Sequence, residues 1–242
     1  MIDKFTILGE RCSGTNYLYN LITKNFDISY TKEYGDKHFR IFNQTNYIDS
    51  NDVLFVGIIR DAYSWVNSLY EKPWHISPEC LTSKFDFLNN EFYSRNPITI
   101  NNERFDFTID LETRTPLKNI GKRNIHDFNI FTNKKFKNIF ECRNVKTRYL
   151  VDLMPSKVKN YVLITYDQIK NNPIETLANM KEIFNLKLRN STIEMYSYYK
   201  NTNKKFKQKK YNHFGYDEIY LHSQFKEELE QRLRFYNYKN SV

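Results

Sequence analysis

The residues best suited to chemistry in this 242-residue chain lie in a glycine-containing turn near its amino terminus. The sequence FTILGERCSGTN carries a short apolar run, residues 5–8, into a turn that contains Gly9 and Gly14. Glycine lets the backbone approach an anion, and the hydroxyls of Ser13 and Thr15 and the amides that open a helix are donors to phosphate. The glycine spacing matches a Walker-type loop, but the lysine expected before Thr15 is absent. We interpret the stretch as a candidate anion site; an ordinary strand–turn–helix is the alternative.

A second candidate follows the most apolar stretch of the chain, VLFVGII at 53–59. Arg60 comes directly after this stretch, and Ser68 follows on the next predicted helix. An arginine at the carboxyl end of a strand can bind a phosphate through two donors, and serines four apart, Ser64 and Ser68, share a helix face. The alternative is a surface arginine beside helix-face serines.

The elements that must position these residues alternate between strands and helices. Apolar runs predict buried strands at 5–8, 53–59 and 161–165, and a short strand before Lys37. Helical spacing predicts helices at 15–26, after Asp61, at 140–153, after Asn172 and at 217–235. This alternation predicts an α/β fold with a mostly parallel sheet covered on both faces, which binds ligands at the carboxyl ends of its strands. We expect a single domain, 1–242, with an insertion at about 75–135.

Three of the predicted helices have identifiable faces and ends. Asp61 is expected to cap a helix with Trp65, Val66 and Leu69 inward. Asn172, Pro173 and Glu175 are expected to act as N-cap, first-turn proline and capping-box acid. The residues expected to face inward on the last two helices are Ile174, Leu177, Ala178 and Phe184, and then Leu221, Phe225, Leu229 and Leu233.

Composition narrows the class of protein. The chain carries 37 Lys and Arg against 28 Asp and Glu, a formal charge of +9, and 40% hydrophobic residues. This content supports a folded core, and the basic excess predicts an anionic partner. No stretch approaches the ~20 apolar residues of a membrane span, and the first residues lack a signal-peptide core. We therefore expect a soluble, cytoplasmic protein without a membrane partner.

The cysteines and histidines show no metal-ligand or disulfide spacing. Cys12, Cys80 and Cys142 are odd in number and far apart, and the five histidines form no HExxH-type pattern. The sequence predicts neither a disulfide framework nor a metal.

Together, these stretches resemble the cofactor sites of the sulfotransferase superfamily that uses 3′-phosphoadenosine 5′-phosphosulfate (PAPS). RCSGT, from Arg11 to Thr15, is similar to the family's PKSGT loop, which cradles the 5′-phosphosulfate. Arg60 and Ser68 match the arginine and serine that hold the 3′-phosphate, and YVLITYDQIKNNPIETLANMKEIFNL, from Tyr161, looks like the family's VRYEDL segment and following helix. GERCSGTN is similar to a subgroup of small sulfotransferase-like proteins. The resemblance excludes most of 75–135 and implies a three-layer P-loop-like fold.

The resemblance also implies roles for individual residues. In place of the family's loop lysine the chain has Cys12, and the adjacent Arg11 would supply only the electrostatic part of that role, since arginine does not release a proton. His38 occupies a place similar to the family's base, and Lys37 would bind sulfonate oxygens. The competing bases are His75, His126 and Glu33. The cofactor-binding residues implied are Arg11, Cys12, Ser13, Gly14, Thr15, Asn16, Arg60, Ser68, Lys209 and Lys210, with His38, Arg11 and Lys37 as catalytic residues and Tyr166 and Asp167 as supports.

The function implied is the metal-independent transfer of a sulfonate group from PAPS to a hydroxyl, with a carbohydrate as the acceptor class that the family suggests. Two alternatives remain: a catalytically impaired nucleotide- or anion-binding P-loop protein, and a small ATP-dependent kinase. The lysine run at 200–210 is either a loop over the 3′-phosphate or a solvated charged segment, and it does not favour nucleic acid because the aromatic residues are spread throughout the chain. The aromatic residues that would either contact an acceptor or form core are Trp74, Phe85, Phe87, Phe92 and Tyr93.

Overall fold

The structure is a computed structural model. It describes residues 1–35, 37–38, 47–95, 98–100, 103–105, 108–114, 125–197 and 210–232.

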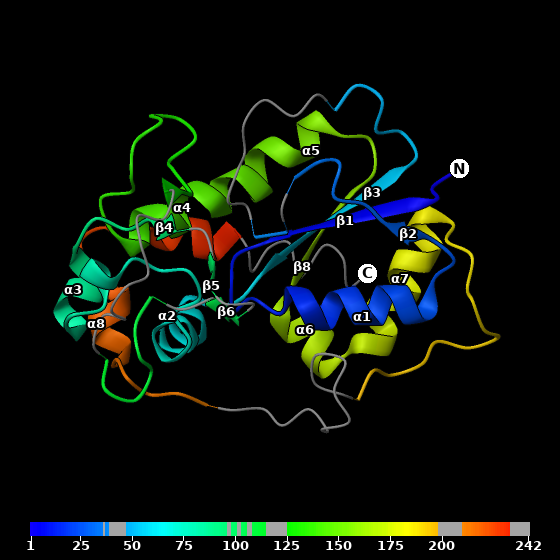
Figure 1. The fold of residues 1–242 in the computed structure, drawn as a ribbon. Helices are drawn as coiled ribbons and strands as arrows, with labels where there is room; N and C mark the ends of the chain where they lie inside the picture. Colours follow the sequence, from blue (N-terminus) through cyan, green and yellow to red (C-terminus); the bar gives the residue numbers. More distant parts are fainter. Residues whose placement is uncertain are drawn as a thin grey trace.

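A parallel sheet forms the centre of the fold (Figure 1). Its strands are β1 (Lys4–Gly9), β2 (Ser29–Tyr30), β3 (Val53–Ile59) and β8 (Tyr161–Thr165), in the order β2-β1-β3-β8, and every pairing is parallel. β3 is buried along its whole length, as its apolar sequence predicts for a central parallel strand. The predicted α/β class and parallel sheet are confirmed.

Helices cover both faces of this sheet. On one face lie α1 (Thr15–Asn25), α6 (Tyr166–Asn171) and α7 (Pro173–Phe184). On the other lie a π-helical turn at Tyr149–Leu153 and α5 (Met154–Lys157), which continue from α4 (Ile139–Arg148) (Figure 1). Because successive strand residues point to opposite faces, β3 contributes to both cores. Leu54, Val56 and Ile58 pack on the α1 side, whereas Val53, Phe55 and Ile59 pack on the Leu150 side. The result is the three-layer arrangement typical of P-loop-like folds.

A third hydrophobic cluster lies beyond the carboxyl ends of the strands (Figure 1). It is built from α2 (Ala62–Glu71), the short 3₁₀ helix Pro78–Cys80, α3 (Lys84–Asn89), α4 and α8 (Tyr216–Tyr220). Two small antiparallel ladders belong to this region, β4 (Ser94–Arg95) with β7 (Ile125–His126) and β5 (Ile98–Ile100) with β6 (Glu103–Phe105). None of these short strands pairs with the main sheet, so the described part of 75–135 lies outside the parallel layer.

The helix starts agree with the prediction at Asp61 and differ at Asn172. The Asp61 carboxylate accepts a hydrogen bond of 2.7 Å from the Ser64 amide, and Trp65, Val66 and Leu69 are buried as predicted. Asn172 does precede α7 and Pro173 opens it, but the Asn172 side chain makes no capping hydrogen bond within the described chain. The capping box lies one helix earlier, between Thr165 and Gln168. Because α6 ends at the residue before Asn172, the backbone there has φ −130° and ψ 53°, outside the extended conformation of most N-caps.

Two predicted helix faces are also corrected. On α7, Leu177 is buried and Phe184 partly buried, but Ile174 is 52% exposed and Ala178 is exposed; Met180 completes the face instead. The helix predicted over 217–235 is broken: α8 ends at Tyr220, Leu221 is 78% exposed, and a helical segment resumes at 227–232. The His222 ring stacks on Phe140 with centroids 4.1 Å apart, so packing against α4 bends the chain away from a continuous helix. Leu229 is buried as expected, and Leu233 lies outside the described residues.

Candidate functional site

The turn between β1 and α1 is tightly packed against the start of α6. Gly14 has φ 92°, a left-handed conformation that favours glycine, and a Cβ there would lie 2.5 Å from the Tyr166 ring. Cys12 also has a positive φ, 64°, and the Ser13 amide donates to the Glu10 carbonyl at 3.1 Å. The turn is therefore strained at Cys12, and its shape depends on the contacts around it.

A lysine lies at the positive end of α1. The first turn of α1 has no acidic residue and no side-chain cap within the described chain. The Lys37 ammonium donates to Asn16 Oδ1 at 2.5 Å, and the Gly9 amide donates to the Lys37 carbonyl at 2.9 Å. A cation beside a helix N-terminus is unfavourable alone and becomes favourable when an anion lies between them. Lys37 thus adds a positive charge beside the start of α1.

Arg60 adds a second cation at the same turn. Its Nη1 donates to the Cys12 carbonyl at 3.0 Å, and its guanidinium lies 4.8 Å from the centroid of the Tyr166 ring. Its Nε is buried and has no hydrogen-bond partner among the described residues. Because a buried charged donor without a partner is costly, this nitrogen is suited to an anionic ligand. We call the group formed by residues 12–16, Lys37 and Arg60 the anion cradle.

Ser68 contacts Cys12 through a different atom from Arg60. The Cys12 thiol donates to the Ser68 carbonyl at 3.7 Å, while the Cys12 carbonyl accepts from Arg60. Ser68, through its main-chain carbonyl, and Arg60 thus both contact Cys12. Burial raises the pKa of the Cys12 thiol, in spite of the Ser68 contact and the charge of Arg60. Burial thus disfavours the thiolate form of Cys12.

Arg11 does not lie in the anion cradle. Its side chain is 1% exposed, and each end of the guanidinium has an internal partner. Nε donates to Glu10 Oε1 at 3.3 Å, Nη1 to the Trp74 carbonyl at 2.7 Å, and Nη2 to Asp127 Oδ2 at 3.1 Å. The structure thus corrects the expectation that Arg11 substitutes for a loop lysine: this guanidinium points into the interior because two buried carboxylates hold it there.

The same buried region brings together ligand atoms of Glu10, Asp127 and Cys142 within 4.8 Å of one another. The Lys146 ammonium already lies 2.7 Å from an oxygen of each carboxylate. Burial and the two carboxylate charges act on this group, and the net effect raises the pKa of Lys146. A lysine thus supplies the positive charge that a metal ion would supply there, so the donor set does not fit a metal.

His38 adjoins the anion cradle through the chain. It is half-buried and follows Lys37, whose carbonyl is hydrogen-bonded to Gly9 at the carboxyl end of β1. Among the competing bases, Glu33 is exposed and His75 is 6% exposed with φ 63°. The His126 side chain lies outside the described residues.

The remaining predicted residues divide between described and undescribed parts of the chain. Thr15 is 3% and Ser13 2% exposed, and Ser13 also lines a small cavity with Trp65 and Lys146. Lys210 is exposed, while Lys209 lies outside the described residues. Of the five aromatic residues considered for an acceptor, Phe87, Phe92 and Tyr93 are core, Trp74 is half-buried and Phe85 is 70% exposed.

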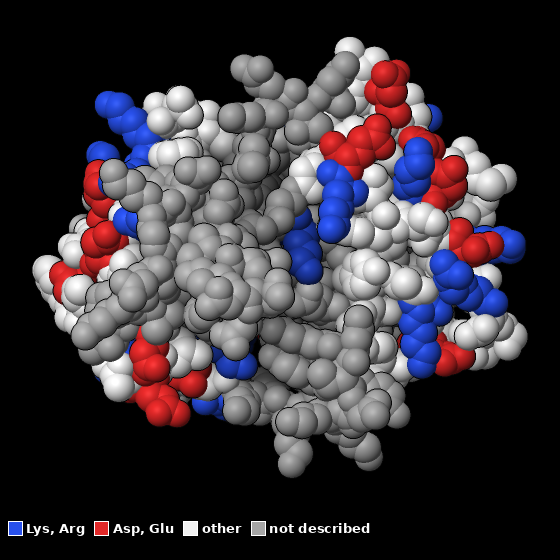
Figure 2. All heavy atoms as spheres, in the orientation of Figure 1, with Lys and Arg blue, Asp and Glu red and all other residues white. Residues whose placement is uncertain are grey.

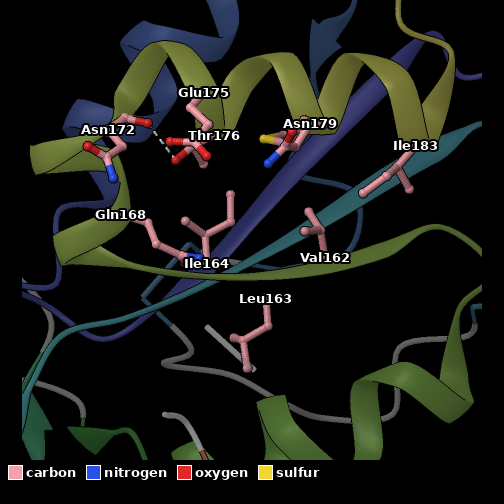
Figure 3. A pocket seen from close by; sticks show the side chains of 10 residues that line it. Val162, Leu163, Ile164, Gln168, Asn172, Glu175, Thr176, Asn179 and Ile183 are labelled. Carbon is pink, nitrogen blue, oxygen red and sulfur yellow. Dashed lines mark hydrogen bonds between the residues drawn. The ribbon is translucent and has the colours of Figure 1, made fainter. Parts of the chain in front are cut away.

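A separate pocket lies between β8 and α7 (Figure 3). Figure 3 shows Gln168, Asn172, Thr176 and Asn179 along it, with Ile183 at one end. Glu175 is the charged residue in its lining, so the pocket lacks the cations that the turn after β1 provides. Its lining therefore does not suit a phosphate.

Surface charge is mixed on the described part of the face in Figure 2, where Lys and Arg alternate with Asp and Glu. Several lysines there and elsewhere are paired, as in Lys4–Asp52 at 2.7 Å, Lys24–Glu194 at 2.8 Å and Lys187–Asp27 at 2.9 Å. On this face the described cations therefore form no broad basic patch.

Sequence reasoning missed Asp127 and Lys146, which hold Arg11, and it underrated Tyr166, which packs on Gly14 and Arg60. Asp127 and Lys146 are far from the turn in sequence and belong to no motif. The sequence did indicate Tyr166 as a site residue, since it directly follows a predicted buried strand.

Fold and site together define an α/β protein with a parallel sheet and an anion cradle at the carboxyl ends of β1 and β3. No family model, no curated protein and no solved structure matches the chain. Within the described residues, none of the helices is both long enough and apolar enough to cross a bilayer.

Proposed function

We propose that the anion cradle binds PAPS and that the protein transfers its sulfonate group to a hydroxyl. The observation that carries this proposal is Arg60, whose buried Nε lacks a hydrogen-bond partner among the described residues while its Nη1 is held on the Cys12 carbonyl. A guanidinium fixed in this way presents a remaining donor to a phosphate. The resemblance of RCSGT, Arg60 and Ser68 to the PAPS-binding motifs identifies which nucleotide to test.

The roles are assigned with one change from the sequence-based expectation. Arg60 and Ser68 bind the 3′-phosphate, and the amides of Ser13 to Thr15 bind the 5′-phosphosulfate. The resemblance implies an electrostatic role for both Arg11 and Lys37. We assign it to Lys37 alone, because its ammonium lies at the start of α1 whereas Arg11 is buried. Lys209 and Lys210 remain candidates for closing over the 3′-phosphate.

PAPS supplies a sulfonate group activated by its bond to a phosphate. The acceptor oxygen forms a bond to sulfur as the bond between sulfur and the phosphate oxygen breaks, which releases 3′,5′-bisphosphoadenosine. His38 accepts the hydroxyl proton, a task suited to a group with an ordinary pKa near neutrality. Lys37 and the α1 amides stabilise charge on the departing phosphate. A carbohydrate hydroxyl is the acceptor class proposed.

Calorimetry with 3′,5′-bisphosphoadenosine, ADP and ATP, with and without magnesium, tests the proposal. We expect binding of the bisphosphate that does not depend on magnesium and that weakens when the 3′-phosphate is absent. A preference for magnesium–ATP would instead support a kinase. The proposal is refuted if the protein binds none of the three nucleotides.

The burial of Arg11 favours a second candidate, a protein that binds the nucleotide without transferring sulfonate. Incubation with ³⁵S-labelled PAPS and a panel of glycan and phenol acceptors separates the two candidates. Transfer that is lost in His38→Ala, with bisphosphate affinity retained, supports the enzyme. Tight binding with no transfer to any acceptor and no release of labelled sulfate supports the binding protein.

A further inference from the structure

Four buried charged side chains form a closed ring behind the turn after β1. Glu10 Oε1 lies 3.3 Å from Arg11 Nε, and Arg11 Nη2 lies 3.1 Å from Asp127 Oδ2. Lys146 Nζ then lies 2.7 Å from Asp127 Oδ1 and 2.7 Å from Glu10 Oε2. The signs alternate around the ring, and the four formal charges cancel. We call these four residues the charge ring.

The charge ring joins three segments that are far apart in sequence. Glu10 and Arg11 belong to the turn, Lys146 to α4, and Asp127 to the chain just after β7. Asp127 is also fixed from the insertion side, because the Ser94 hydroxyl donates to its Oδ2 at 3.0 Å. The ring therefore ties the turn to both the helical layer and the region predicted to face an acceptor.

Stability alone does not account for such a ring. All four side chains are at most 10% exposed, so each charge has lost nearly all of its hydration. Buried ion pairs of this kind are often no more stabilising than apolar residues of similar volume, and their best-attested use is to select one conformation. In this fold the conformation selected is that of the turn.

The path from the ring to the anion cradle is short. The Arg11 carbonyl accepts a hydrogen bond of 2.9 Å from Trp65 Nε1, so side chain and backbone of this residue are both fixed. The next residue, Cys12, has the positive φ of 64° and presents its carbonyl to Arg60. A shift of Arg11 would therefore move the group that holds Arg60.

We propose that Asp127 and Lys146 are positioning residues that act through Arg11 to hold Cys12 and Arg60 in the nucleotide-binding arrangement. The proposal rests on the proposed function for its ligand. Neither residue touches the nucleotide; each sets the shape of the turn that does.

The test compares Asp127→Asn with Leu177→Ala, measured as folded proteins below their melting temperatures. Leu177 is 1% exposed in the α1–α7 core, so its truncation lowers stability without touching the ring. We expect Asp127→Asn to weaken binding of 3′,5′-bisphosphoadenosine about tenfold and the control to leave it unchanged. If Asp127→Asn does not fold, the double variant Asp127→Asn/Lys146→Met, which removes one charge of each sign, replaces it.

A readout that needs no nucleotide distinguishes failure of this inference from failure of the proposed function. Cys12 is half-buried, whereas Cys80 and Cys142 are buried, so alkylation by iodoacetamide followed by mass spectrometry reports the state of the turn. We expect faster Cys12 alkylation in Asp127→Asn than in wild type and in Leu177→Ala. Unchanged alkylation together with unchanged nucleotide affinity would overturn the inference. If wild type binds no nucleotide, the proposed function fails and the Cys12 rate alone decides whether the ring positions the turn.

Discussion

The turn after β1 has an inward side and an outward side that use the same residue types in opposite ways. Inward, Arg11 is 1% exposed, and its donors bind Glu10, Trp74 and Asp127. Outward, Arg60 keeps a buried donor without a partner among the described residues, and Lys37 lies at the start of α1. An arginine surrounded by carboxylates is structural, whereas an arginine held by a carbonyl and a ring retains its charge for a ligand. Changes on the inward side should therefore alter stability first, and changes on the outward side affinity first.

The largest effect is expected from Arg11→Met. Glu10 and Asp127 would then share only the charge of Lys146 in a buried site, and breaking such a network costs about 3–5 kcal/mol of unfolding free energy. Urea denaturation followed by circular dichroism measures it. Arg60→Met is the comparison and should cost less than about 1 kcal/mol, because Arg60 is only partly buried. Equal losses of unfolding free energy in the two variants would contradict the proposed difference between the inward and outward sides.

A pH-dependent loss of stability is expected from Glu10. Burial disfavours the charged carboxylate, but the charges of Lys146 and Arg11 outweigh burial and lower the pKa of Glu10 from 4.5 to about 2. Because this folded-state pKa lies below the unfolded one, the contribution is fully present above about pH 5 and is lost as pH falls towards 2. It amounts to about 3 kcal/mol.

Chemical denaturation between pH 2 and 7 measures this contribution. Glu10→Gln, which cannot ionise, should lose less stability than wild type over that range. Parallel pH profiles for the two proteins would show that the ring does not depress the pKa of Glu10.

Arg60→Ala is expected to weaken binding of 3′,5′-bisphosphoadenosine about tenfold to a hundredfold, the value of a hydrogen-bonded charge lost from a phosphate. Arg114→Ala is a matched control. The Arg114 guanidinium also lies 4.8 Å from an aromatic centroid, that of Tyr70, and its Nη1 also donates to a carbonyl, at 2.8 Å. Calorimetry measures the affinity of both variants. A comparable loss of affinity in Arg114→Ala would contradict the assignment of Arg60 to the binding site.

The smallest effect is expected from Lys37→Met. Lys37 is half-buried, so solvent screens its charge. We therefore expect about a fivefold loss of bisphosphate affinity and an unchanged melting temperature. Lys170→Met, a half-buried lysine on α6 that pairs with Asp167, serves as control. If Lys37→Met leaves the bisphosphate affinity unchanged, Lys37 does not have the electrostatic role proposed for it.

Local patterns were sufficient for the elements that carry the site. The apolar runs predicted β1, β3 and β8 because a parallel strand buried on both faces needs apolar residues at consecutive positions. Asp61 predicted the start of α2 because its carboxylate caps a neighbouring amide, a contact made within four residues. Gly14 predicted the turn because a left-handed residue favours glycine.

Patterns failed where a distant contact decides the outcome. The helix expected over 217–235 is interrupted because His222 packs on Phe140 of α4, and Ile174 is exposed because α7 buries Leu177 and Met180 instead. No spacing rule contains these contacts, since they depend on how separate helices meet.

The amino-acid sequence was sufficient for the α/β class, the strands and the turn, since each follows from neighbours along the chain. The direction of Arg11 was not predictable. Its partners Asp127 and Lys146 are brought to the turn only by folding, and burial then makes their charges strong enough to draw the guanidinium inward. Arg11 and Arg60 therefore differ because two buried carboxylates draw Arg11 inward, whereas the buried Nε of Arg60 has no hydrogen-bond partner among the described residues.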